Sequence, residues 1–248
     1  MVTAILSALP EEQAGLVQAL EQPQRGVHAG RVYWRGSLRG RSVVLAQSGI
    51  GKVAAATTAV GLIERFGVAR IVFTGVAGGL GEGVRVGDVV VASDFVQHDM
   101  DASPLFPRFE LPGQGRSRLP CDARLSGMLL AAAQTALGDG AGTPRDAVHA
   151  GARVHHGLMA SGDRFVSSAA ESHALRNALQ GAGHAVLAVE MEGAAVAQVC
   201  GDYGVPFAAM RTISDRADDA AHIDFPQFIA TVASRYAEHI VGEWLDRL

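Results

Sequence analysis

Apolar runs of strand length alternate with helical patterns along the whole chain. The first run, residues 2–9, is closed by Pro10, and residues 11–20 then show helical spacing of apolar positions. Further strand patterns lie at 27–34, 42–47, 70–74, 86–95, 154–159, 185–189 and 206–213. Helical patterns lie at 122–137, 169–179 and 193–199, between SGIGK and Gly67, and from Asp224 and Pro226 to Trp244.

This alternation predicts an α/β fold with a mainly parallel sheet and helices on both faces. The chain has no internal repeat, linker or low-complexity tract, so we expect one domain over residues 1–248. Two irregular segments interrupt the pattern, a glycine-rich turn at 75–79 and a loop at 99–115 with three prolines. Long loops inside compact domains are usually functional, which makes the second segment a candidate.

Acidic residues stand where three of the predicted strands end. Glu11 and Glu12 follow the first strand, Glu190 and Glu192 follow a strand in the last third of the chain, and Asp215 follows the final strand. Because ligands bind outside the carboxyl ends of strands in such sheets, we expect these acids to face one crevice. The plainer alternative is that they cap helices or lie in solvated turns.

Composition narrows the class of protein. The 248 residues are 48% hydrophobic and 19% charged, which is typical of a globular chain. The net charge of -4 and the 6% aromatic content offer no surface for a nucleic acid polymer. Cys121 and Cys200 lack a redox or ligand spacing, and the amino terminus has neither a signal peptide pattern nor a membrane span, which favours a cytoplasmic protein.

Six segments closely resemble one enzyme family, the 5'-methylthioadenosine/S-adenosylhomocysteine nucleosidases of the nucleoside phosphorylase and nucleosidase superfamily. They are SGIGKVAAA at 48–56, TGVAGGL at 74–80, VGDVVVAS at 86–93, SGDRFV at 161–166, VEMEGAAVA at 189–197 and RTISDRAD at 211–218. The resemblance runs in order from the first strand to the last helix. It implies a three-layer α/β/α sandwich around a mixed sheet, and hydrolysis of an N-glycosidic bond that releases adenine, without a cofactor.

Such a hydrolysis passes through an oxocarbenium-like state and needs an acid, a group that handles water, and hydrogen bonds to the sugar. The resemblance makes Asp215 the acid that protonates purine N7 and Glu12 the residue that orients or deprotonates water. Arg211 would support Glu12 or hold an acidic neighbour in place. Glu192 would accept hydrogen bonds from the ribose hydroxyls, and its predicted place at a helix start is expected to keep it ionised.

The remaining candidates are substrate contacts that the resemblance implies. Phe165 would stack on the adenine, the main chain of Val166 would read its edge, and Met191 would pack against the ribose. Glu190 could be a second site residue or a structural acid. The other expected contacts are Ala77 and Gly78, where the backbone can approach the ligand, Ser214, and the 5'-alkylthio pocket residues Leu9, Ile50 and Phe225.

The loop at 99–115 bears on assembly and on substrate choice. With Leu105, Phe106 and Phe109, it resembles the segment that a neighbouring subunit contributes in the family, which implies a homodimer. Residues 98–108 are nevertheless unlike the most familiar members, and Val76 stands where the nucleosidases commonly have a serine. Arg108 could meet an anionic 5' group, so AMP and futalosine remain alternative substrates.

The sequence disfavours three other classes of protein. A phosphorylase needs cations around phosphate, and the relatives that are phosphorylases have basic residues where this chain has residues 9–12 (LPEE) and Phe73; glutamate there repels phosphate and favours water. A non-catalytic nucleoside sensor is disfavoured because Glu12, Glu192 and Asp215 occur together. None of the nine histidines has an ordinary zinc spacing, so we assign no metal.

Overall fold

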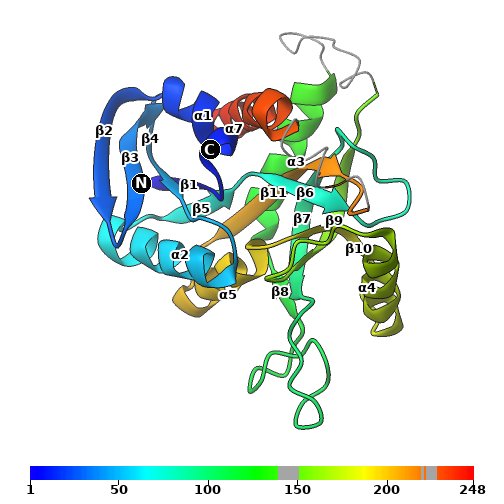
Figure 1. Cartoon of the computed structure of the whole chain (residues 1–248). Helices are drawn as coiled ribbons and strands as arrows, with labels where there is room; N and C mark the ends of the chain where they lie inside the picture. The colour runs from blue at the N-terminus through cyan, green and yellow to red at the C-terminus, as the bar shows by residue number, and fades with distance from the viewer. Residues whose placement is uncertain (139–150, 219–220, 222–227) are drawn as a thin grey trace.

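A computed structural model describes residues 1–138, 151–218, 221 and 228–248. Within them, the chain forms one eleven-stranded sheet in the order β2-β3-β4-β1-β5-β11-β6-β10-β9-β7-β8 (Figure 1). The strands are β1 Thr3–Ser7, β2 Glu21–His28, β3 Arg31–Leu38, β4 Arg41–Gln47, β5 Arg70–Phe73, β6 Val76–Gly79, β7 Val89–Gln97, β8 Arg118–Pro120, β9 Val154–Ser161, β10 Val186–Glu190 and β11 Phe207–Asp215. Six of the eleven strand pairings are parallel, so the sheet is mixed as predicted.

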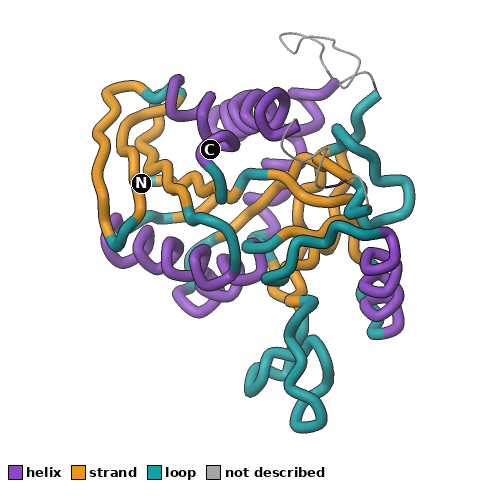
Figure 2. The backbone as a smooth tube through the Cα atoms, viewed as in Figure 1, coloured by secondary structure: helices purple, strands orange, loops and turns teal. Residues whose placement is uncertain are grey.

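Helices cover both faces of this sheet (Figures 1 and 2). They are α1 Pro10–Gln18, α2 Lys52–Phe66, α3 Ala123–Gly138, α4 Ala169–Gly181, α5 Gly193–Tyr203, the π-helix η1 Ile229–Ala233 and α7 Ser234–Asp246. Helices α1, α3 and α7 share one apolar core with the strands, α2 and α5 share a second core on the other face, and α4 packs against β10. This arrangement confirms the three-layer α/β/α sandwich. No described helix combines the length and apolar character needed to cross a bilayer.

Two of the predicted elements are wrong. The single strand expected at 27–34 is a hairpin, because Ala29 and Gly30 take positive φ values of 48° and 74° and turn the chain between β2 and β3. The glycine-rich turn expected at 75–79 is the strand β6, which pairs parallel with β11 and antiparallel with β10. Pairing on both sides satisfies its backbone, which local turn propensity does not reveal.

The topology brings the acidic strand ends together. Strand β6 lies between β11 and β10, so the ends of β10 at Glu190 and of β11 at Asp215 flank it, and β1 leads directly into the α1 turn that carries Glu12. The loop between β7 and β8 projects from the body as a long arm (Figures 1 and 2). The predicted start of the last helix, at Asp224 and Pro226, lies outside the described residues.

Candidate active site

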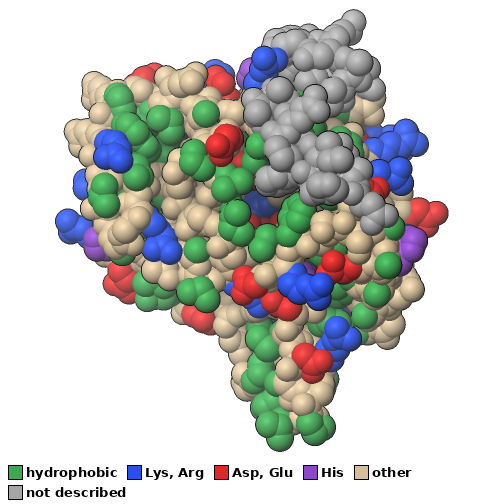
Figure 3. Space-filling view, viewed as in Figure 1, with side chains coloured by type: hydrophobic (Ala, Val, Ile, Leu, Met, Phe, Trp, Pro, Cys, Tyr) green, Lys and Arg blue, Asp and Glu red, His purple; other side chains and the backbone are tan. Residues whose placement is uncertain are grey.

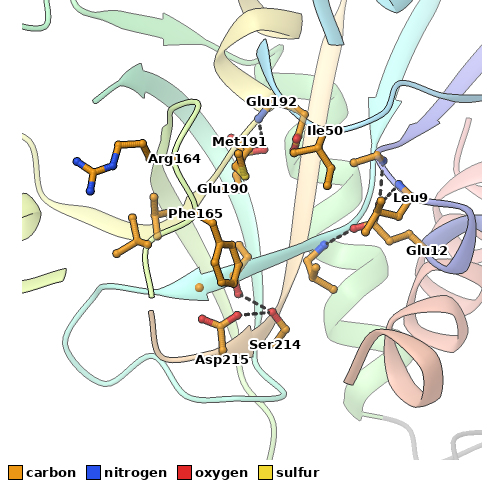
Figure 4. Close-up of a pocket in the computed structure, with 16 residues that line it drawn as sticks. Leu9, Glu12, Ile50, Arg164, Phe165, Glu190, Met191, Glu192, Ser214 and Asp215 are labelled. Atoms are coloured by element: carbon orange, nitrogen blue, oxygen red, sulfur yellow. Dashed lines mark hydrogen bonds between the residues drawn. The ribbon is translucent and has the colours of Figure 1, made fainter. Parts of the chain in front are cut away.

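A cavity of about 390 Å³ opens at these strand ends (Figure 4). Glu12 and Leu9 lie on one side of it, Ser214 and Asp215 on a second, Met191 and Glu192 on a third, and Phe165 opposite Glu12. Its lining is Ala8, Leu9, Glu12, Ile50, Val76, Ala77, Gly78, Arg164, Phe165, Val166, Val189, Glu190, Met191, Glu192, Ser214 and Asp215. The expected convergence of three acidic strand ends is therefore present, except that Glu11 is exposed and outside the pocket.

Glu12 is held by backbone donors in the third position of α1. Its Oε2 accepts the N–H groups of Ala8 and Leu9 at 2.8 and 2.9 Å, and Oε1 accepts that of Val76 at 3.0 Å. Burial raises its pKa, against the opposing effects of these donors and of the Arg211 charge. The side chain caps the start of α1 by accepting the Leu9 N–H, and it also lines the pocket. A role in helix capping and a place in the site are therefore compatible for Glu12.

Glycines make room for both acids. A Cβ at Gly75 would lie 2.7 Å from Glu12 Oε1, and one at Gly78 would lie 2.9 Å from Asp215 Oδ1 and from the Cβ of Ala217. Asp215 Oδ2 accepts the Ser214 hydroxyl at 2.8 Å, while Oδ1 accepts the Ala217 N–H at 2.8 Å. The carboxyl is thus fixed in orientation at the pocket wall, in space that only glycine at 78 leaves free.

Glu190 is tied into the wall between β10 and α5. It accepts hydrogen bonds from the Gly193 N–H at 2.8 and 2.9 Å and from the Ser161 hydroxyl, and it pairs with Arg211 Nη2 at 2.6 Å. The Arg211 guanidinium also lies over the Phe73 ring, 4.0 Å from its centroid. Arg211 is only 1% exposed and does not line the pocket, so the acidic neighbour that it holds is Glu190.

The surroundings of Glu192 bear on its ionisation. It does occupy the N-cap position of α5, but its side chain makes no capping bond there and accepts the Gly51 N–H at 2.8 Å instead. Burial, and next the negative charge of Glu190, raise the pKa of Glu192 to about 8. Desolvation and the neighbouring acid therefore oppose the ionisation that the helix start was expected to favour.

Apolar side chains make up most of the remaining wall. Ile50 and Phe165 are 57% and 43% exposed and stand at the mouth of the cavity, whereas Val166 is buried. Met191 lies between the two glutamates along the chain and lines the same side. The site is therefore a largely apolar cavity with a few fixed polar groups, the usual form of a small-molecule pocket.

Eleven of the thirteen predicted site residues line this cavity. Arg211 lies behind it, and Phe225 lies outside the described residues. Sequence reasoning did not assign Ala8, Arg164 or Val189, although each adjoins a predicted residue along the chain. Ser161 was also missed as a support for Glu190; its place directly after a predicted strand, in the segment SGDRFV, was the available signal.

Acidic side chains outnumber basic ones in the wall of the cavity. Among its described lining residues four are acidic and one, Arg164, is basic; Arg164 is exposed and pairs with Glu171 at 2.6 Å. In the described part of the chain, this cavity included, no group of three or more histidine, cysteine or acidic side chains is arranged to hold a metal ion. The arrangement suits proton transfer and hydrogen bonding to a neutral polar ligand.

Comparison with known proteins agrees with this geometry. Residues 2–243 match the sequence model of the Phosphorylase superfamily, which defines the class of the protein. A 5'-methylthioadenosine/S-adenosylhomocysteine nucleosidase of Geobacillus thermodenitrificans is 36% identical over 243 residues, 98% of this chain and 95% of that protein. The chain belongs to this nucleosidase family.

Solved structures give the same relationship. The Neisseria meningitidis nucleosidase of that name, in complex with methylthio-immucillin-A, superposes with a TM-score of 0.88 at 35% identity, covering 100% of this chain and 99% of that one. A futalosine hydrolase mutant of Helicobacter pylori strain 26695 has a TM-score of 0.86 at 29% identity and full coverage of both chains.

Proposed function

We propose that the protein hydrolyses the N-glycosidic bond of 5'-methylthioadenosine and S-adenosylhomocysteine, releasing adenine and the 5-thioribose product. The observation that carries the proposal is the meeting of Glu12, Glu192 and Asp215 in one buried, largely apolar cavity. The names of the relatives and of the Neisseria structure support the choice of substrate.

The proposed chemistry separates acid and base work between two carboxyl groups. Asp215 donates a proton to N7 of the purine, so that the bond to C1' breaks with its electron pair leaving on the base. Glu12 accepts a proton from water as the water oxygen bonds to C1' of the oxocarbenium-like ribosyl group. The burial that raises the pKa of Glu12 makes its ionised form a stronger base for this step.

The sugar and the base are proposed to be held by different walls. Glu192 accepts hydrogen bonds from the ribose hydroxyls, and Met191 packs against the ring. Phe165 covers one face of the adenine, and the backbone of Val166 meets its edge. Leu9 and Ile50, with Phe225, would receive the 5'-alkylthio group.

Water is favoured over phosphate because of the charges. A phosphate dianion needs cationic partners, and Arg164 is the one basic side chain among the described residues that line this cavity. Arg164 already pairs with Glu171, and the buried Arg211 with Glu190. Phosphorolysis is accordingly the less favoured reaction.

A second candidate substrate is futalosine, on the observation that a futalosine hydrolase shares the fold over the full chain. The exposed Ile50 leaves the 5' side of the mouth open, so a larger 5' substituent could extend from it. Arg108, which the sequence suggested for an anionic 5' group, lies on the arm, stacks on Phe109 and is 3.7 Å from Asp101. It does not line the cavity of its own chain.

The arm is proposed to contact a second copy of the chain in a homodimer. Leu105 is 83% exposed on it, and apolar side chains gather at the far end of the arm (Figure 3). Phe109, by contrast, is buried against His184 of the same chain and is not available to a partner. A cytoplasmic location stays part of the proposal, in keeping with the thiols Cys121 and Cys200 being free.

Release of the free purine base from a panel of nucleosides and a nucleotide tests the proposal. Purified protein is given methylthioadenosine, adenosylhomocysteine, futalosine, AMP and inosine in separate reactions, and the free base is quantified by chromatography. We expect rapid release from the two thio-nucleosides. Faster release from futalosine or AMP would move the assignment to that substrate, and no release from any of them would leave a nucleoside-binding sensor.

A further inference from the structure

Three segments around the cavity mouth are joined by a ring of hydrogen bonds that the proposed chemistry does not use. Lys52 is the first residue of α2, Asp99 follows β7 at the base of the arm, and Asp163 follows β9. They lie 47 and 64 residues apart along the chain. None of the three lines the cavity itself.

The ring closes through both side chains and backbone. Lys52 Nζ donates to Asp99 Oδ1 at 2.6 Å, Asp99 Oδ2 accepts the Asp163 N–H at 2.9 Å, and Asp163 Oδ1 accepts the Lys52 N–H at 2.7 Å. Lys52 Nζ also donates to Gln97 Oε1 at 2.9 Å. Each residue of the ring thus contacts both of the others, so loss of the Lys52–Asp99 bond opens the ring and leaves the three segments linked only in a chain through Asp163.

The surroundings favour the ionised form of Asp99. The side chains of Lys52 and Asp99 are 17% and 27% exposed, so solvent screens them less than a surface pair. Burial alone would raise the pKa of Asp99, but the hydrogen bonds from Lys52 and from the Asp163 N–H bring it below its ordinary value. Asp163 also supplies the acceptor that α2 lacks, since Gly51 at its N-cap has no side chain.

Pocket residues adjoin the ring on every side. Ile50 lies two residues before Lys52, and Phe165 lies two residues after Asp163. Gly51, between Ile50 and Lys52, donates its N–H to Glu192. The ring therefore sets the spacing between the proposed 5' side, the base-stacking side and the ribose acceptor of the cavity.

We propose that Lys52, Asp99 and Asp163 are positioning residues that hold the cavity mouth in the arrangement that binds nucleoside. The inference rests on the proposed function, because methylthioadenosine is taken as the substrate. With the ring intact, Ile50, Phe165 and Glu192 keep the separation across the cavity that fits a nucleoside. With it broken, the protein spends part of its time in arrangements that do not bind, and the apparent affinity falls by that fraction. At saturating substrate, Glu12 and Asp215 still carry out the chemistry.

The test is a steady-state comparison of Asp99→Asn and Lys52→Met with the wild type on methylthioadenosine. An asparagine can accept only one of the two hydrogen bonds well. Loss of one charge-assisted bond is expected to raise KM about tenfold, and kcat is expected to change by less than about threefold. Lys52→Arg, which keeps the charge, should recover most of the affinity.

Two controls separate positioning from general stability. Asp94→Asn, on the strand β7 that precedes Asp99, removes a partly buried acid paired with Arg118 outside the ring, and its KM should equal that of the wild type. The double variant Lys52→Met with Asp99→Asn should raise KM no more than either single change, because both break one ring. An unchanged KM in Lys52→Met, or additive effects in the double variant, would overturn the ring. A wild type that releases no adenine would instead contradict the proposed function.

Discussion

At Glu192 the surroundings oppose the ionisation that hydrogen bonding to a ribose requires. The carboxyl is buried beside Glu190, and its pKa is raised to about 8, so in the free protein at neutral pH it is mostly protonated. Ribose hydroxyls donate to a carboxylate and favour its ionised form. Binding of nucleoside should therefore expel a proton from this group.

This coupling gives the first prediction. Methylthioadenosine binding to the Asp215→Asn protein should release close to one proton at pH 7, and affinity should rise with pH until about pH 8 and then level off. Calorimetry in buffers of different ionisation enthalpy measures the release. Adding Glu192→Gln to this protein should abolish the proton release and weaken methylthioadenosine binding about tenfold or more. Proton release that survives this substitution would assign it to another group.

The same raised pKa makes a prediction for stability. A carboxyl whose folded-state pKa lies above its unfolded value contributes stability below the unfolded pKa, and this contribution is lost as pH rises through the folded one. For Glu192 the window runs from about pH 4.5 to about pH 8. In thermal unfolding, Glu192→Gln should lose less stability than the ligand-free wild type across this window. Parallel losses in the two proteins would count against the raised pKa.

Asp215 has a separate role that mutation can isolate. Asp215→Asn keeps acceptor capacity for the Ser214 hydroxyl but removes the proton that would go to N7. We expect kcat to fall by about 10²- to 10⁴-fold, the usual contribution of a general acid. The unfolding temperature should change little. Turnover at the wild-type rate would remove Asp215 from its assigned role, and Asp202→Asn, an exposed acid on α5, serves as the control.

At the scale of elements, β6 explains why glycines cluster before the site. Gly78 lies where any side chain would meet Asp215 and Ala217 at 2.9 Å. Gly78→Ala should therefore displace the Asp215 carboxyl and lower kcat about 10²-fold, because small misplacements of a catalytic group are costly. Gly26→Ala on β2, with open space around it, should leave kcat unchanged. Full activity in Gly78→Ala would show that the wall adjusts.

An element could be predicted when the residues that determine it are close together along the chain. Periodicity located α1 to α5 and most strands to within a few residues, because their burial follows local patterns of apolar side chains. It failed at β6, whose pairing partners β10 and β11 are more than 100 residues away along the chain. It failed at the β2–β3 turn because Ala29 is not a residue that commonly takes positive φ.

For the site, motifs predicted which residues converge but not how their charges shift one another's pKa values. Glu12, Asp215 and Glu192 were assigned from their place after strands and from family resemblance, and all three line the cavity. The raised pKa of Glu192 was not predictable, because it depends on burial and on the distance to Glu190. The Lys52, Asp99 and Asp163 ring was equally hidden, since nothing along the chain links its members.

At the scale of the whole molecule, the arm bears on assembly. Leu105 on the arm is 83% exposed. Burying this apolar side chain against a partner subunit would remove it from water and so favour association. Leu105→Asp should shift the protein from dimer toward monomer in sedimentation at micromolar concentration. Val27→Asp, an exposed position on β2 at the opposite end of the sheet, should leave the assembly unchanged. A wild-type monomer would contradict the proposed dimer.

The most direct test of the account is the identity of the nucleophile. Methylthioadenosine is incubated with the protein in phosphate-free buffer and again with added phosphate, and the sugar product is identified by mass spectrometry. A cavity whose described lining offers phosphate no unpaired cation predicts adenine and free methylthioribose at the same rate in both. A rate that depends on phosphate, with methylthioribose 1-phosphate as the product, would contradict the hydrolase and make the protein a phosphorylase.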